Sequence, residues 1–273
     1  MPNLRHPAIL LFAAALLWLG GCASNRPAEE AFDPESLGVT DRVRHYQVEI
    51  RRNPEDPDLH YRLGNALLDM GRYQDAYRSY QGAIQLKRDH ADAYANLGLA
   101  LRRMGQLKAA AGAYVQALEL NPGDRTTLTN LLVVAELMED WDRVEWCLER
   151  LAMVSPDDPG LIAAHADVLH RLGRPAEAAP LYEAAAKSAD PARNLYRAGL
   201  CYADLLQWPR AVALWELARA AEPENPSINR GLAVAHWEAG NLAAARAAIA
   251  RCEELDIPLD PEFLRQVNSA PAE

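Results

Sequence analysis

Small and apolar residues recur along the chain at a fixed spacing. The pairs Leu63-Gly64 and Leu97-Gly98 lie 34 residues apart. Each pair is followed by an alanine and then by a tyrosine: Ala76 and Tyr80 in the first copy, Ala110 and Tyr114 in the second. Apolar residues that return every three or four positions predict helices, and the longer spacing predicts that a pair of helices repeats as a unit.

This spacing divides most of the chain into six units. By register the units span 57–90, 91–124, 125–158, 159–191, 192–225 and 226–259. Before them, the helical spacing of Val43, Tyr46 and Ile50 predicts a helix over Val39–Arg52. After them, Pro261–Val267 predicts a short C-terminal helix.

The pattern resembles the tetratricopeptide repeat, a helix–turn–helix unit of this length that stacks into a solenoid. The resemblance implies an all-α, right-handed solenoid of about six repeats over 57–259. A capping helix would lie before it, in 37–56, and a second capping helix with a polar tail would follow, in 260–273.

Four positions of the repeat bear on packing or on the turn between its helices. A small residue at the eighth position, such as Gly199, lets the first helix approach its partner, and a large one at the twenty-fourth, such as Trp215, fills the gap. The third repeat departs, with Leu132 at the eighth position. Glycine closes four of the first helices, but Glu139 and Leu206 stand at that position in the third and fifth repeats. The aromatic residues at the seventeenth position are expected to pack between helices: Tyr73, Trp141 and Trp208.

Residues 1–21 have the pattern of a lipoprotein signal peptide. A basic start at Arg5 is followed by an apolar run over 8–19 that is too short to favour a membrane span. The run ends in Leu19-Gly20-Gly21-Cys22, which resembles a bacterial lipobox. We therefore expect cleavage before Cys22, acylation of that cysteine, and a polar tether over 22–36. The alternative is cleavage nearby by an ordinary peptidase, with the cysteine unmodified.

The residues after Cys22 bear on the membrane that would hold the lipid. Ala23 and Ser24 follow the cysteine, whereas an aspartate there commonly retains a lipoprotein in the inner membrane of bacteria with two membranes. Two or more acyl chains anchor a protein stably. The resemblance to a lipobox, without an aspartate after the cysteine, therefore implies an anchor in the outer membrane, facing the periplasm.

Charge, cysteines and histidines exclude several classes of function. The formal net charge of −10 argues against a basic face for nucleic acid. The cysteines after the signal region are far apart and are expected to be small buried residues: Cys147, Cys201 and Cys252. His165 and His170 are five residues apart, so they face different sides of a helix and do not form a metal pair. We expect no enzyme activity, no metal, no cofactor and no small-molecule substrate.

In the family that the chain resembles, the first helices line a concave groove. The resemblance places these candidate partner-binding residues there: Tyr61, Asn65, Asn96, Arg102, Arg103, Asn130, His170, Arg171, Arg193, Tyr196, Arg197, Arg230 and Trp237. Asn65 and Asn96 match asparagines that hold a peptide backbone in chaperone-binding relatives, since an amide both donates and accepts. The basic residues of that carboxylate clamp are missing where Tyr61 and Asn130 stand, which disfavours a receptor for chaperone tails. Arg193 and Arg197 fall at clamp positions, but in the fifth repeat.

These features favour a lipid-anchored adaptor of the cell envelope that binds a partner peptide or helix. Its layout is similar to that of the repeat lipoproteins that assist pilus or secretin assembly. An alternative with a different partner is an adaptor that regulates peptidoglycan hydrolases or envelope proteases. A remote alternative is an enzyme, for which the sequence offers no site.

Overall fold

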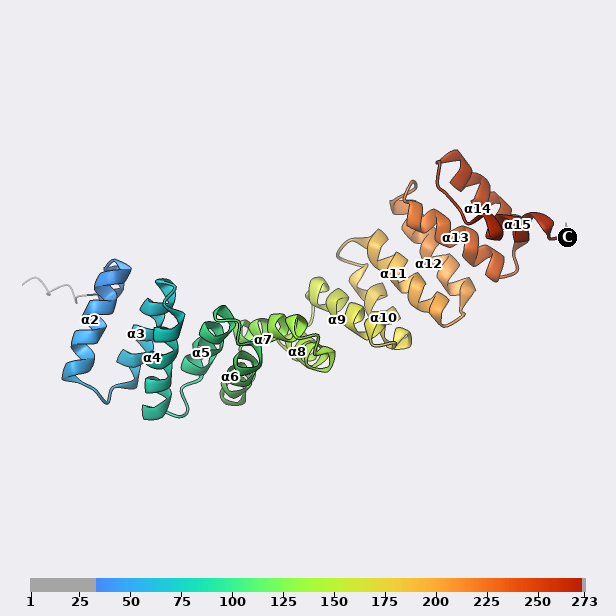
Figure 1. The fold of residues 1–273 in the computed structure, drawn as a ribbon. Coiled ribbons are helices and arrows are strands. Elements are labelled where there is room, and N and C mark those ends of the chain that lie inside the picture. The colour runs from blue at the N-terminus through green and yellow to red at the C-terminus, as the bar shows by residue number, and fades with distance from the viewer. Residues whose placement is uncertain (1–32, 272–273) are drawn as a thin grey trace, which may run out of the picture.

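The computed structural model describes residues 33–271, and this part of the chain holds 14 α-helices and no strand (Figure 1). A short 3-10 helix, η1 (Pro34–Ser36), comes first. The α-helices follow in this order: α2 (Val39–Arg52), α3 (Pro57–Asp69), α4 (Tyr73–Leu86), α5 (Ala91–Arg103), α6 (Leu107–Leu120), α7 (Arg125–Leu137), α8 (Trp141–Val154), α9 (Pro159–Arg171), α10 (Pro175–Ala185), α11 (Pro191–Asp204), α12 (Trp208–Ala221), α13 (Pro226–Glu238), α14 (Leu242–Glu254) and α15 (Pro261–Ser269). The expected signal peptide, the lipid on Cys22 and most of the tether lie outside the described residues.

Neighbouring helices pack as hairpins, and the hairpins follow one another in an elongated, curved array (Figure 1). Each of the pairs α3/α4, α5/α6, α7/α8, α9/α10, α11/α12 and α13/α14 is one such hairpin. At the N-terminal end α2 packs on α3, and at the other end α15 lies beside α14. The helix predicted over Val39–Arg52 has those bounds. The all-α solenoid that the repeat pattern predicts is confirmed.

Every repeat buries its large twenty-fourth residue within the array. These residues are Tyr80, Tyr114, Leu148, Tyr182, Trp215 and Ile249. The cluster around Tyr80 draws on four helices: Tyr46 of α2, Leu67 of α3, Ala76 beside it on α4, and Ala100 of α5. A single hairpin could not cover its own apolar stripe, so the repeats depend on their neighbours for burial.

The third repeat fills the same space with different side chains. An added Cβ at Gly98 in the second repeat would lie 2.7 Å from the Tyr114 ring, so that ring occupies the room the glycine leaves. In the third repeat Leu132 and Leu148 pack in one cluster and divide the space between two medium side chains. The hairpin α7/α8 therefore forms with an apolar contact of its own, despite its departure from the pattern.

A residue in the left-handed conformation follows each first helix. The glycines at this position have φ between 72° and 76°: Gly71, Gly105, Gly173 and Gly240. Glu139 (φ 55°) and Leu206 (φ 56°) adopt the same conformation without being glycine. After Leu206, the Gln207 N–H donates to the Tyr202 carbonyl at 2.8 Å, which closes the turn. The stack therefore imposes this turn even where the local sequence disfavours it.

Replacing Leu206 by glycine is expected to stabilise the protein. Leu206→Gly should raise the free energy of unfolding by about 1 kcal/mol, because glycine adopts positive φ without steric cost. The leucine side chain is 73% exposed, so little packing is lost. Urea denaturation measures the change. The reciprocal control is Gly173→Ala, where an added Cβ meets nothing within 4 Å and backbone strain alone should cost a similar amount. Destabilisation by Leu206→Gly would contradict the account of this turn.

The described helices show neither a membrane span nor a reactive thiol. None of the helices in 33–271 is long and apolar enough to cross a bilayer. Cys147, Cys201 and Cys252 are buried free thiols, as expected. Burial raises the pKa of Cys147 and of Cys201 to about 12, which keeps both protonated and unreactive at neutral pH.

Candidate functional site

The first helices of the first three repeats contact one another on one side of the array. Contacts join α3 to α5 and α5 to α7 across the repeats. This is the arrangement expected on the inner side of a curved solenoid. We call the exposed side of α3, α5, α7, α9, α11 and α13 the first-helix face, and all of the predicted partner-binding residues belong to these helices.

At the N-terminal end of this face, two asparagines and two tyrosines form a hydrogen-bonded network. The Asn96 amide of α5 donates to the Asn65 Oδ1 of α3 at 2.9 Å and to the Tyr61 hydroxyl at 3.3 Å. The Tyr80 hydroxyl also donates to Asn65 Oδ1, at 2.9 Å. The Tyr61 ring lies 4.9 Å from that of His90, centroid to centroid. The structure thus brings Tyr61, Asn65 and Asn96 together.

The network leaves one donor group and one acceptor group free. Within the described residues, the Asn65 amide nitrogen donates no hydrogen bond and the Asn96 amide oxygen accepts none. Both side chains are half-buried, so they are held in place and still reach solvent. A donor and an acceptor on adjacent helices match the alternating N–H and C=O groups of an extended peptide.

The hydroxyl groups of Tyr80 and Tyr114 differ in their partners. Tyr80 donates to Asn65, whereas the buried Tyr114 hydroxyl has no partner among the described residues. Leu99 stands at the ninth position of the second repeat, where the first repeat has Asn65. Burial raises the pKa of Tyr114 to about 12, so its hydroxyl stays neutral.

Removing these two hydroxyls is expected to have different effects. Tyr80→Phe should cost about 1 kcal/mol of unfolding free energy, because it breaks a hydrogen bond. Tyr114→Phe should leave stability unchanged or raise it slightly, because its hydroxyl is buried without a partner. Chemical denaturation of the two variants beside the parent checks this. Equal losses would show that the Tyr80–Asn65 bond contributes nothing.

In the middle of the face, the predicted residues stay free. Arg102 and Arg103 end α5, and neither forms an ion pair within 33–271. Asn130, on α7, is half-buried, and its side chain makes no hydrogen bond to the described residues. These groups remain available to a partner.

In the C-terminal half, several predicted residues pair with one another or with their neighbours. Arg197 of α11 forms an ion pair with Asp167 of α9 and lies over the Tyr182 ring, 5.8 Å from its centroid. The Nε2 atom of His170 lies 2.7 Å from the Oδ2 atom of Asp204. Arg171 covers the Trp141 ring at 4.4 Å. These three side chains make contacts between neighbouring repeats, so their charged groups are less available to a partner.

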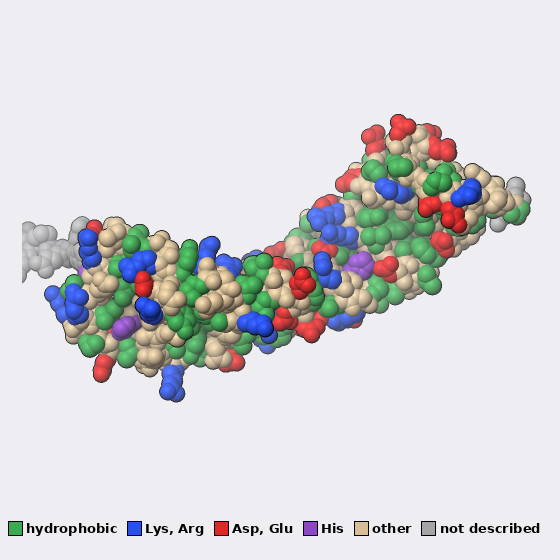
Figure 2. Space-filling model, viewed as in Figure 1, with side chains coloured by type: hydrophobic (Ala, Val, Ile, Leu, Met, Phe, Trp, Pro, Cys, Tyr) green, Lys and Arg blue, Asp and Glu red, His purple; other side chains and the backbone are tan. Residues whose placement is uncertain are grey.

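Two clefts lie among the remaining predicted residues. Arg193 and Arg197 line a cleft of about 260 Å³ between α9 and α11, with Asp167 on its other side. A second cleft of about 430 Å³ is lined by Tyr196, Trp208, Trp215, Arg230, Gly231 and Val234. Figure 2 shows hydrophobic side chains gathered over this C-terminal region, with charged groups around them. Trp237 packs against the core instead, half-buried.

The sequence did not reveal the aromatic floor of the second cleft. Tyr196 stacks on Trp215 with ring centroids 5.8 Å apart, and the Trp215 indole N–H donates to the Tyr196 carbonyl at 2.8 Å. An added Cβ at Gly231 would lie 3.1 Å from Trp215, so the glycine lets α13 pack closely against this buried ring. Trp208 packs on the core as expected and also lines the cleft. The sequence feature that could have indicated this floor is Gly231, the glycine at the sixth position of the sixth repeat.

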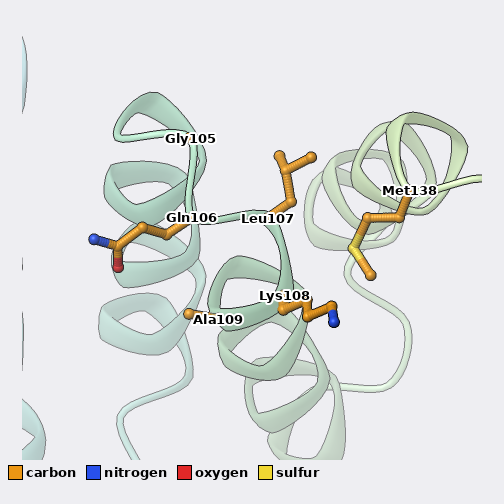
Figure 3. Close-up of a pocket in the computed structure, with 6 residues that line it drawn as sticks. All are labelled: Gly105, Gln106, Leu107, Lys108, Ala109 and Met138. Carbon is orange, nitrogen blue, oxygen red and sulfur yellow. The ribbon is translucent and has the colours of Figure 1, made fainter.

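Another open cleft, of about 600 Å³, lies away from the first-helix face (Figure 3). It is lined by Gly105, Gln106, Leu107, Lys108, Ala109 and Met138, at the turn between α5 and α6 and the end of α7. In Figure 3 the Leu107 and Met138 side chains extend into the space between α6 and α7, and Gln106 points away from it. Lys108 is the one charged residue among them, so this lining offers no acid–base pair.

Comparisons with known proteins identify the repeat. A model described as "TPR repeat" matches residues 64–105. Models described as "Tetratricopeptide repeat" match 45–78, 91–124 and 196–257. The chain therefore belongs to the tetratricopeptide-repeat proteins. No curated protein matches its sequence.

Solved structures share the fold at low sequence identity. The Naa15/Naa10 complex bound to HypK-THB matches with a TM-score of 0.71 and 16% identity, over 85% of this chain and 36% of that one. YrrB, a repeat protein "with an unusual peptide-binding site", matches at 0.54 and 21% identity, over 68% and 96%. The type IV pilus biogenesis factor PilW matches at 0.43 and 20% identity, over 64% and 81%, a likeness too low to inform function.

Proposed function

We propose that this chain is a lipid-anchored adaptor of the bacterial cell envelope, which holds a segment of a partner protein on its first-helix face. A solenoid of tetratricopeptide repeats is a protein-interaction scaffold. The observation that carries the proposal is the pair of free amide groups on Asn65 and Asn96, set on adjacent helices by the network around them. YrrB, with the same fold, has a peptide-binding site.

The charges of the face favour a partner segment with acidic groups. The chain carries a formal net charge of −10, yet several arginines of the first helices form no ion pair within the described residues: Arg102, Arg103, Arg193 and Arg230. An exposed guanidinium gains most from a carboxylate, which it can bind through two hydrogen bonds. Tyr196 lines the second cleft together with Arg230, and its ring offers an apolar contact for the same segment.

The proposed lipid anchor is supported by the sequence around Cys22 and is tested apart from binding. Cells grown with labelled palmitate should incorporate the label into the protein, and Cys22→Ala should abolish labelling and release the protein from the membrane fraction. A matched control is Cys252→Ala, which removes a buried thiol in the solenoid and should leave labelling unchanged. An unlabelled protein that fractionates alike in both variants would contradict the anchor.

The partner decides between two roles in the envelope. Co-purification from crosslinked membranes should recover pilus or secretin subunits if the adaptor assists their assembly. Recovery of peptidoglycan hydrolases or envelope proteases would support the regulatory alternative. We propose no catalytic role; hydrolytic activity that one substitution abolishes would contradict this part of the proposal.

A further inference from the structure

Three side chains with metal-binding atoms meet where α8 packs on α9, away from the proposed partner site. Glu145 and Glu149 lie four residues apart on α8, and His165 lies on α9. Four residues make about one helical turn, so the two carboxylates share a face. One oxygen of each and a ring nitrogen of His165 all lie within 4.8 Å of one another.

The imidazole of His165 supplies an independent indication of a ligand. Its Nε2 atom is buried and has no hydrogen-bond partner among the described residues. A buried polar atom without a partner is unfavourable, and such atoms commonly mark an ion or water. A second orphaned imidazole, that of His90, has a carboxylate 3.6 Å away, on Asp58. A ring nitrogen of His165 has two carboxylates nearby, and no ion pair joins the imidazole to either.

Arg174 holds one of the carboxylates in position. Its Nη1 donates to both oxygens of Glu145, at 2.7 and 2.8 Å, and its other nitrogens donate to Glu177. Each carboxylate oxygen has a second lone pair, so this contact leaves Glu145 able to bind a cation while it fixes its orientation. The three glutamates outnumber the single arginine by two charges, which favours a dication.

We propose that Glu145, Glu149 and His165 bind one divalent first-row metal ion such as Zn²⁺, with water completing its coordination. One imidazole nitrogen and two carboxylate oxygens form a ligand set that suits this class of ion. Metal–ligand distances of about 2.0–2.2 Å require the three side chains to draw together. Glu149 is exposed and free to rotate, so it can make this movement.

Such an ion would link α8 to α9, the least closely packed pair of consecutive helices in the repeat array. Of all consecutive helices from α2 to α14, these two make the least extensive contact. The joint connects the hairpins α7/α8 and α9/α10, so it sets how the two halves of the first-helix face are placed (Figure 1). The metal would therefore act as a structural clamp.

Titration of the full chain with Zn²⁺ tests the site. After treatment with EDTA and its removal, calorimetry should show one ion per chain. His165→Gln and Glu149→Gln should each weaken binding about tenfold or more, because each removes a ligand. His170→Gln is the matched control, since His170 lies on the same helix outside the cluster, and it should bind as the parent does.

Two further readouts separate this site from other modes of zinc binding. Zn²⁺ should raise the melting temperature of the parent and of His170→Gln, but not that of His165→Gln. Co²⁺ in place of zinc should give a visible spectrum without a thiolate-to-metal band, which excludes the cysteines. Equal affinity in the parent and His165→Gln, or no binding at about 100 times the protein concentration, would overturn the proposal.

Discussion

Gly199→Ala is expected to lower the free energy of unfolding by about 3 kcal/mol. An added Cβ would lie 2.2 Å from the Trp215 Nε1 and 2.5 Å from its Cδ1, so the indole ring has to move. The ring has little freedom to do so, because it is 3% exposed and its N–H donates to the Tyr196 carbonyl. Chemical denaturation measures the loss as a lower midpoint.

Gly112→Ala is the matched control and should have the opposite sign. Gly112 lies within α6, is exposed, and an added Cβ there meets nothing within 4 Å. Alanine is the better helix former, so this variant should gain about 0.5–1 kcal/mol. If Gly199→Ala were as stable as the parent, the close approach of α11 to α12 around Trp215 would not constrain the fold.

Arg193→Glu is expected to weaken binding of the partner by about tenfold or more, with no loss of stability. A lost charge-assisted hydrogen bond of about 1.5–3 kcal/mol corresponds to this change in affinity. Arg193 is exposed and forms no ion pair among the described residues, so the folded chain does not depend on its charge. The measurement is the affinity for the co-purified partner, beside the melting temperature.

Arg197→Glu provides the contrast, because the structure gives Arg197 an internal role. Its reversal would break the ion pair with Asp167 and place two carboxylates side by side over Tyr182. We expect this variant to lose both binding and stability, so it cannot isolate the partner site. Unchanged binding by Arg193→Glu at the parent's stability would show that the partner contacts another surface.

The helices were predictable because their signals are local. Apolar spacing and the Asn53-Pro54 stop give α2 its bounds, and the spacing of glycines and prolines gives the register of the hairpins. The third repeat departs from the repeat pattern when each position is considered singly, since Leu132 replaces a small residue. Leu132 and Leu148 pack in one apolar cluster, and only the structure shows that these two side chains fill the space between the helices together. Leu206 adopts a left-handed turn that its own side chain disfavours, because the stack imposes it.

The sequence predicted which helices carry the candidate residues, but not how those residues pair with one another. The repeat register places Asn65, Asn96 and Arg193 on first helices, and the helices are there. The partners of Arg197 and His170 lie about one repeat away along the chain, so no local pattern announces them. The same holds for Glu145, Glu149 and His165, because the two glutamates lie on α8 and the histidine on α9, so no pattern within one helix joins the three.

Site-specific photocrosslinking in living cells tests the central claim, that a partner protein lies on the first-helix face. A photoreactive residue would replace Arg103 or Arg193 on this face, and, as controls, the exposed Gln116 of α6 or Leu217 of α12 on second helices. The account predicts one and the same envelope protein crosslinked from Arg103 and Arg193, and no such adduct from Gln116 or Leu217. Adducts from the second helices alone would contradict it.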